Sequence, residues 1–492
     1  MQHTVTILPE NKILFAKDGA PLLSLLRDNG FLVPAACGGN GSCGKCKVKL
    51  LSGSVTGTSP DADGLVRSCR ARIASDLVIE YSPKSATESP AASPIRTSKS
   101  LGAVLDIGTT TLALRVCDLA NRNTFTEAAA LNPQAAYGAD VLSRINAFSK
   151  GEGGALQQLI LNETNRMLGE LAGIGTRLQR MIVAANPTML HLFLGIDPTP
   201  IGTYPFTPAF HSTQRLSGDA LGLPVDEVIL LPFAHAYVGG DVTAGVLFCN
   251  MQDAEESALL LDIGTNGEMV LSHHNRLTCT SAAAGPALEG ASIECGIGGV
   301  AGAISHVQLK KGALRLETVG GVAPTGICGS GLVDLIAILV SEGMIDEGGT
   351  WDNACESTLA AHLVADRFYL CDGIYLSQAD IRQFQLAKAA ISAGIKSLLK
   401  ESGASLNEIG KVYIAGGMGF YIDPESARIT GLLPHFENAS ITAVGNTSLL
   451  GGELCLDPLV LSKAEDTASE MKHLELSFSE EFRNTYIEDM GF

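Results

Sequence analysis

Two short apolar runs, each ending in an acidic residue and a glycine, form a repeated pattern in this chain. The sequence Leu-Asp-Ile-Gly-Thr occurs at 105–109 and again at 261–265, each time at the end of an apolar stretch. A second apolar run follows each copy, so the pattern predicts two strands joined by a tight turn. Because five identical residues recur in the same context, we interpret the two hairpins as copies of one structural unit.

The remaining pattern predicts strands and helices on both sides of these hairpins. Residues 377–399 read as a long amphipathic helix. The C-terminal tail predicts a strand at 474–478 and a helix within 482–492. The N-terminal part predicts a helix at 21–28 and short strands at 4–8, 12–17, 46–51 and 77–81.

The residues of each hairpin turn suit the binding of phosphate. Gly108 and Gly264 allow tight turns whose backbone N–H groups can approach an anion. Asp106 and Asp262 end their strands, where a carboxylate can hold Mg²⁺ through its waters. The alternative is a pair of ordinary β-hairpins, which the duplication disfavours. The further candidate nucleotide-binding residues in the two turns are Thr109, Thr110, Thr111, Thr265, Asn266 and Gly267.

Four cysteines near the N-terminus have the spacing of an iron–sulfur site. Cys37, Cys43, Cys46 and Cys69 follow the pattern C-x5-C-x2-C-x22-C, which is close to that of plant-type [2Fe–2S] proteins. The loop between the first three is rich in glycine, so its backbone N–H groups can point at sulfur. A zinc site is the alternative, but zinc ribbons prefer two C-x2-C pairs and only one is present.

Composition divides the chain into four predicted segments. Residues 82–100 hold six Ser and three Pro with almost no apolar residue, which indicates a linker. Extended at about 3 Å per residue, it would span roughly 50 Å, enough for a swinging electron carrier or simply a spacer. We therefore expect a domain at 1–81, a first lobe at 101–255 and a second lobe with the tail at 256–492.

Charge and targeting signals limit the classes of partner. The formal net charge is −18, which disfavours nucleic acid and anionic membranes. No leader-like start and no run of 18 apolar residues is present, so we expect a cytoplasmic protein with reduced or metal-bound cysteines. No P-loop motif occurs.

The paired hairpins resemble the phosphate 1 and phosphate 2 motifs of the superfamily of acetate and sugar kinases, chaperone ATPases and actin. By this resemblance residues 414–419 match the adenosine motif, with Gly416 and Gly417, and residues 445–452 match a connecting motif. Asp106, Asp262 and Asp140 would be the catalytic acids. Asp140 would orient the attacking water or merely begin a helix, and Asp241 is a second candidate acid.

A β-grasp [2Fe–2S] domain joined to a two-lobed actin-like (RNase H-like) ATPase resembles the reductive activators of corrinoid-dependent enzymes. The resemblance rests on the four cysteines and on residues 262–268, 283–290, 326–331 and 415–419. It implies an α/β and α+β multidomain fold and the cofactors [2Fe–2S], ATP and Mg²⁺.

The same resemblance implies ATP-dependent reduction of Co(II) to Co(I). The substrate would be a corrinoid protein or a corrinoid-dependent methyltransferase component, and the electrons would come from a low-potential donor. The assembly state stays open, a homodimer included. Larger members carry an extra domain after the linker, which this chain lacks. A small-molecule kinase with a fused ferredoxin, and an electron carrier with a regulatory nucleotide site, remain alternatives.

The segment after the second hairpin, residues 280–290, is predicted to be a loop of small residues. Thr280 or Ser281 would then offer an oxygen to a docked corrinoid partner. The alternative is a tight packing corner inside the second lobe.

Overall fold

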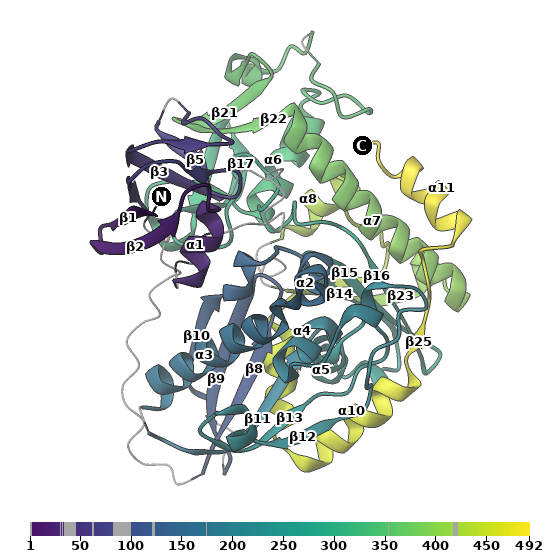
Figure 1. Cartoon of the computed structure of the whole chain (residues 1–492). Helices are drawn as coiled ribbons and strands as arrows, with labels where there is room; N and C mark the ends of the chain where they lie inside the picture. The colour runs from purple at the N-terminus through teal and green to yellow at the C-terminus, as the bar shows by residue number, and fades with distance from the viewer. Residues whose placement is uncertain are drawn as a thin grey trace.

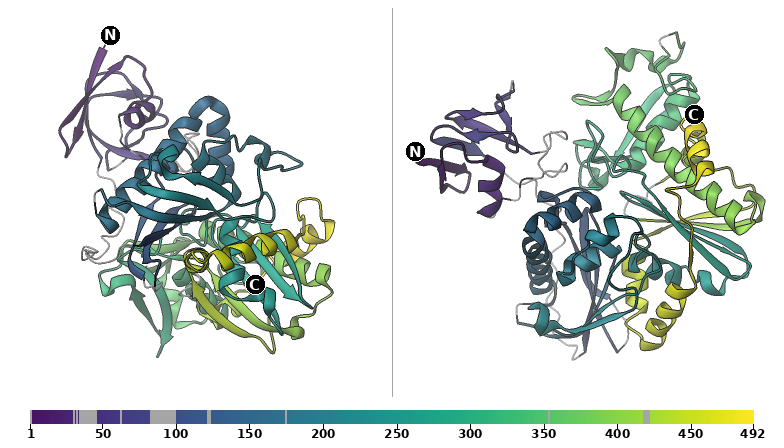
Figure 2. Two further views of the ribbon diagram at one scale, coloured as in Figure 1. Left: turned by 90° about the horizontal axis from the view of Figure 1, so that it is seen from below. Right: turned by 45° about the vertical axis from the view of Figure 1, so that its right-hand side comes forward.

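The computed structural model describes most of the chain. The described residues are 2–29, 31, 33, 46–61, 63–81, 100–120, 124–173, 175–352, 354–416 and 422–492. The chain forms a small N-terminal domain and two larger lobes, and the N-terminal domain lies to one side of the lobes (Figures 1 and 2). None of the described helices is long and apolar enough to cross a membrane.

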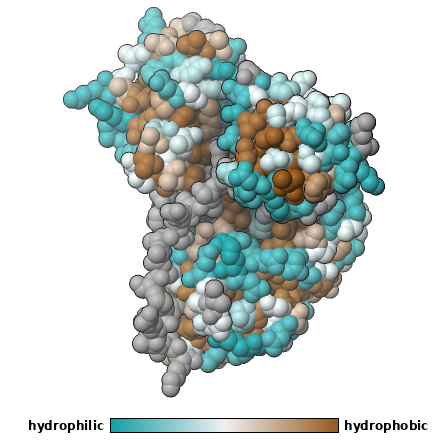
Figure 3. Space-filling model, turned by 60° about the vertical axis from the view of Figure 1, so that its left-hand side comes forward, coloured by the Kyte–Doolittle hydropathy of each residue, from teal (hydrophilic) through white to brown (hydrophobic). Residues whose placement is uncertain are grey.

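The N-terminal domain is a mixed sheet packed on one helix. The sheet has the order β2-β1-β7-β3-β5, and β1 runs parallel to β7. Leu22 and Leu26 of α1 (Leu22–Asp28) are fully buried against it. On the edge strand, Ile13 and Phe15 are 56% and 64% exposed, and Figure 3 shows apolar surface on this domain. The strands are β1 (Gln2–Leu8), β2 (Lys12–Lys17), β3 (Lys47–Ser52), β5 (Leu65–Arg67) and β7 (Leu77–Glu80), with a separate small ladder of β4 (Val55–Thr56) and β6 (Arg72–Ile73).

The first lobe is built on a six-stranded sheet of order β10-β9-β8-β11-β13-β12. Alternate residues of β8 (Leu101–Ile107) enter different cores: Leu105 packs with α3 and α4, whereas Val104 packs with α5, α9 and α10. The other strands are β9 (Thr111–Asp118), β10 (Thr124–Leu131), β11 (Leu178–Ala185), β12 (Gln214–Ser217) and β13 (Val225–Leu230). The helices are α2 (Val141–Ala147), α3 (Gly153–Ala172), α4 (Pro187–Leu194), α5 (Gly240–Phe248), α9 (Thr447–Leu454) and α10 (Pro458–Glu470).

The second lobe repeats this arrangement in a sheet of order β24-β23-β14-β15-β16-β25. Strands β14, β15 and β16 form an antiparallel meander, and β23 and β24 continue it in parallel, as β11 and β13 do in the first lobe. The strands are β14 (Ser257–Ile263), β15 (Gly267–His273), β16 (Arg276–Ala282), β23 (Ile409–Ala415), β24 (Ser440–Gly445) and β25 (Lys472–His473). Five strands repeat in the same order, with β12 and β25 added at opposite edges. This repeat confirms the duplicated unit and the two-lobed actin-like fold.

The second lobe also carries helices and two small sheets. Its longest helix, α7 (Gln378–Ser402), confirms the predicted amphipathic helix and begins at a capping box made by Ser377 and Asp380. The other helices are α6 (Gly329–Ser341), α8 (Pro424–Ile429) and α11 (Glu480–Glu488). The small sheets are made of β17 (Ala303–Lys310), β18 (Ala313–Thr318) and β19 (Gly326–Ile327), and of β20 (Leu363–Val364), β21 (Arg367–Cys371) and β22 (Ile374–Ser377).

Two details of the C-terminal third differ from the prediction. Helices α9 and α10 pack on the first lobe, through side chains such as Leu449 and Leu461, so residues 256–492 do not all lie in the second lobe. The tail strand is Lys472–His473 and not 474–478. The predicted tail helix is present as α11, and it packs on α7 with ion pairs that include Lys396–Asp489.

Candidate functional site

The two predicted hairpins lie at matching positions in the two sheets. Asp106 is the next-to-last residue of β8, and Asp262 is the next-to-last residue of β14. Asp106 pairs with Ala184 on the neighbouring parallel strand, and Asp262 pairs with Ala415 in the same way. Each turn therefore follows the earlier strand of a parallel pair, β8 of the pair β8–β11 and β14 of the pair β14–β23. The carboxyl ends of such strands are where open α/β sheets bind ligands.

One carboxylate connects the two turns. The hydroxyls of Thr110, in the first turn, and Thr265, in the second, both donate to Oε2 of Glu289, at 2.9 and 2.7 Å. The two candidate phosphate-binding turns therefore lie within the reach of one side chain. Glu289 belongs to segment 283–290, one of the segments on which the family resemblance rests, but no feature of the sequence singled it out.

Acidic side chains gather around the two strand ends. The pKa of Asp262 is raised to about 7, first by desolvation and then by the charges of Asp106 and Glu289. Desolvation and the neighbouring Asp262 raise the pKa of Asp241, at the start of α5, to about 8. Desolvation also raises the pKa of Asp106. The pKa of Glu268 is raised by desolvation and by repulsion from the charges of Asp241 and Asp262.

Several ionised carboxylates in a desolvated site cost free energy unless a bound cation neutralises them. No group of three His, Cys, Asp or Glu side chains in the described ranges is arranged to ligate a metal ion directly. Carboxylates at this spacing could hold a cation only through its water shell, which is how Mg²⁺ is commonly bound.

The C-terminal half of the chain orients Asp106. Nδ2 of Asn446 donates to Oδ2 of Asp106 at 2.7 Å, and Oγ of Ser448 donates to Oδ1 at 2.9 Å. Asn446 is also the N-cap of α9, because its own oxygen accepts from the backbone N–H of Leu449. The connecting motif at 445–452 thus ties helix α9 to the first hairpin.

The predicted adenosine motif begins against the second hairpin. Gly416 has φ +94°, and a Cβ there would lie 2.6 Å from the carbonyl oxygen of Ile263 and 2.9 Å from Oδ1 of Asp262. Only glycine fits this close approach. Gly417 lies outside the described residues.

The structure gives Asp140 a capping contact and reveals a buried arginine beside it. Asp140 is the N-cap of α2, since its two oxygens accept from the backbone and hydroxyl of Ser143 at 2.7 and 2.8 Å. Its assignment as the acid that orients water stays a prediction.

Arg144 is fully buried and donates to the carbonyl oxygens of Gly138 and Thr109. Desolvation lowers the pKa of Arg144 to about 9. Sequence reasoning missed this support of the first turn.

Two of the four predicted cluster ligands lie in the described residues. Sγ of Cys46 and Sγ of Cys69 are 3.1 Å apart, and Cys46 is 1% exposed. Two sulfurs converging in this way fit ligation of one group. Cys37 and Cys43 lie outside the described residues.

The predicted docking residues lie in a strand and not in a loop. Thr280 and Ser281 belong to β16. Thr280 is fully buried and donates its hydroxyl to the carbonyl oxygen of Leu474 at 2.7 Å, so it cannot offer that oxygen to a partner. Ser281 points to the other face of the sheet and lies 3.4 Å from Oε1 of Glu268, beside the acidic cluster. A docking role for Ser281 stays a prediction.

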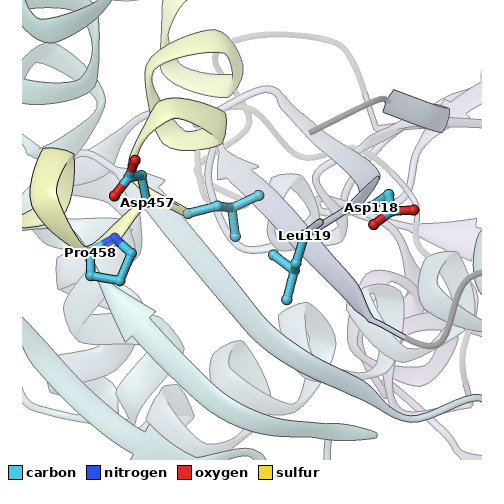
Figure 4. Close-up of a pocket in the computed structure, with 5 residues that line it drawn as sticks. Asp118, Leu119, Asp457 and Pro458 are labelled. Carbon is cyan, nitrogen blue, oxygen red and sulfur yellow. The ribbon is translucent and has the colours of Figure 1, made fainter. Parts of the chain in front are cut away.

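A small cavity of about 150 Å³ lies away from this site. It is lined by Asp118, Leu119, Leu456, Asp457 and Pro458 (Figure 4). Asp118 ends β9, at the opposite end of that strand from the turn residue Thr111. The cavity is therefore not part of the nucleotide site.

Comparison with known proteins agrees with this architecture. Residues 256–492 match the C-terminal domain of RACo, the ASKHA domain, residues 101–254 match the RACo middle region, and residues 5–74 match the 2Fe-2S iron-sulfur cluster binding domain. The corrinoid activation enzyme RamQ of Eubacterium limosum is 31% identical over 454 residues, covering 85% of this chain and 73% of RamQ.

Two further relatives match over most of their lengths. The [Co(II) methylated amine-specific corrinoid protein] reductase of Methanosarcina barkeri is 27% identical over 434 residues, covering 80% of this chain and 77% of the relative. The solved structure of a reductive activator for corrinoid, iron-sulfur protein superposes with a TM-score of 0.75 and 27% identity, covering 100% of this chain and 98% of that one.

The fold and the site define a two-lobed protein of the actin-like (ASKHA) class that carries a [2Fe–2S] domain at its N-terminus. Within that class, the chain belongs to the RACo family.

Proposed function

We propose that this protein reduces the cobalt of a corrinoid protein from Co(II) to Co(I) at the expense of ATP. The names of its relatives support this, since one is a corrinoid activation enzyme and another a reductase of a Co(II) corrinoid protein. The observation that carries the proposal is the presence in one chain of two different sites. Paired cysteine sulfurs lie in a 2Fe-2S domain, and an acidic cluster lies between two matching phosphate-type turns.

In this proposal the acidic cluster holds hydrated Mg²⁺ and the turns hold the phosphates of ATP. Asp106 and Asp262 hold the waters of the cation, and Asn446 and Ser448 keep the carboxylate of Asp106 oriented. The adenosine moiety packs against Gly416, where the absence of a Cβ leaves room. Asp140 orients the attacking water, once a turn of its side chain releases Ser143. The phosphates are bound by the backbone and hydroxyls of Gly108, Thr109, Thr110, Thr111, Gly264, Thr265, Asn266 and Gly267.

The N-terminal domain supplies the electron. Cys46 and Cys69, with Cys37 and Cys43, ligate the [2Fe–2S] cluster, whose chemistry is the storage and transfer of one electron at a time. An external low-potential donor delivers that electron.

The two lobes are joined so that their closure can follow nucleotide binding. Helix α5 packs on both sheets: its Ala244 lies in one core with Val104 of the first lobe, and its Val246 lies in another core with Leu260 of the second lobe. Nucleotide shifts the equilibrium between open and closed lobes only as far as its affinities for the two states differ. Closure then presents β16, with Ser281, to the bound corrinoid protein.

The test is ATP turnover by anaerobically purified protein with and without a corrinoid protein. We expect the Co(II) corrinoid protein to raise the rate of ATP hydrolysis. Phosphorylation of a small molecule would favour the kinase, and cobalt reduction that is equally fast without ATP would favour the electron carrier.

A further inference from the structure

Glu289 is held firmly at the point where the two lobes meet. The preceding residues Ala287 and Leu288 are 2% and 0% exposed and belong to the core of the second lobe. The following residue, Gly290, has φ +76°, and a Cβ there would lie 2.6 Å from the carbonyl oxygen of Ile297. The backbone N–H of Glu289 donates to Pro286 at 3.2 Å. In this arrangement its neighbours hold the backbone of Glu289 in place, and its side chain reaches both turns.

The side chain of Glu289 accepts a hydrogen bond from one threonine hydroxyl in each turn. Thr110 belongs to the first lobe and Thr265 to the second, and both donate to the same oxygen, Oε2, at 2.9 and 2.7 Å. The other oxygen lies over the second turn, since a Cβ at Gly264 would be 3.4 Å from Oε1. Glu289 thus presents a carboxylate where the two turns face each other.

A phosphate group and this carboxylate need the same donors. A threonine hydroxyl has one proton to donate, so it cannot satisfy Glu289 and a phosphate oxygen together. Both acceptors are anionic, and they would repel each other at this short range, because Glu289 is partly buried. The bridged arrangement and the phosphate-bound arrangement therefore exclude each other.

We propose that Glu289 is an internal acceptor that occupies the phosphate donors before nucleotide binds and is displaced when it binds. This inference rests on the proposed ATP site and adds a coupling residue to it. Because the backbone of Glu289 continues β16 through residues 283–288, its displacement passes to the strand that carries Ser281. Glu289 is a positioning residue: the displacement of its side chain couples ATP binding to the conformation of the second lobe.

The proposal predicts tighter nucleotide binding when the carboxylate is removed. If the bridged state accounts for about nine-tenths of the free protein, abolishing it tightens the apparent Kd for ATP by about tenfold. The variants are Glu289→Ala, which removes both acceptor oxygens, and Glu289→Gln, which keeps an acceptor and removes the charge. Glu294→Gln is the matched control, because Glu294 lies on the same segment but bonds to Tyr375 and not to either turn.

Calorimetric titration with ATP, with and without Mg²⁺, measures the effect. We expect the Ala variant to bind about tenfold tighter, the Gln variant to lie between it and the wild type, and the control to match the wild type. ATP-stimulated corrinoid reduction should fall in the Ala variant although its ATP binding improves. Weaker or unchanged ATP binding in both Glu289 variants would overturn the proposal.

A second measurement uses the unmodified protein. Hydrogen exchange of residues 283–297 should rise when ATP is added, because the bridge to both threonines is broken. Exchange that stays constant or falls would overturn the displacement. If the wild type binds no ATP at all, the proposed nucleotide site itself fails, which is a different outcome from unaltered binding in the variants.

Discussion

The acidic cluster predicts that the protein without cation loses stability as pH rises. In the folded protein the pKa of Asp262 lies at about 7, above its ordinary value of 3.8. Between these pH values the folded state binds a proton that the unfolded chain has lost. The free energy of unfolding therefore decreases from about pH 4 to about pH 7 and stays low above that range. Asp241, whose pKa is raised to about 8, changes stability in the same direction.

The size of the effect follows from the pKa of Asp262. Each unit of pKa corresponds to about 1.4 kcal/mol, so Asp262 accounts for at most about 4 kcal/mol. Because this carboxylate keeps some exposure, we expect roughly half of that, about 2 kcal/mol. For a large domain this is roughly 4–8 °C in Tm.

The assay is scanning calorimetry in a chelator over a series of pH values. The Asp262→Asn variant should melt about 4–8 °C above the wild type at pH 8 and at the same temperature near pH 4. It should also lose the stabilisation by Mg²⁺ and ATP. Asp466→Asn, at an exposed position on α10, is the control and should follow the wild type. A wild type as stable at pH 8 as at pH 4, or an Asn variant without gain, would refute the reasoning.

Three further predictions concern the other parts of the site. Cys46→Ser should lose the iron and sulfide, expected at two of each per chain, while ATP binding stays unchanged; zinc in anaerobically prepared wild type would contradict the cluster. Asn446→Ala should raise the KM for Mg²⁺–ATP about tenfold, since Asp106 loses a charge-assisted hydrogen bond of about 1.5 kcal/mol; an unchanged KM in steady-state kinetics would count against this orientation. Gly416→Ala places a Cβ 2.6 Å from Ile263 at φ +94°, so calorimetry should find it destabilised by about 1–3 kcal/mol and unable to bind ATP; normal binding would mean that adenosine lies elsewhere.

Features that repeat or have a period could be predicted from the sequence. The two hairpins were found because identical residues recur, and α7 was found because its apolar positions follow the helical period. The cysteines were found by their spacing, although only Cys46 and Cys69 lie in the described residues.

The contacts that the sequence did not predict join residues that are far apart in the chain. Glu289 reaches Thr110 across 179 positions, and Asn446 reaches Asp106 across 340 positions. Neither side chain belongs to a periodic pattern, so only the fold brings these pairs together. Strand β16 was missed because small and polar residues such as Thr280 and Ser281 lie on both of its faces, and the packing of α9 on the first lobe depends on tertiary contacts alone.

The most direct test of the central claim is the absorbance of Co(I) in a mixture of the prereduced protein and a Co(II) corrinoid protein. We expect Co(I) to accumulate when Mg²⁺–ATP is added and not when it is withheld, and we expect the Asp262→Ala and Cys46→Ser variants to fail. Co(I) that forms at the same rate without ATP, or with either variant, would contradict the account.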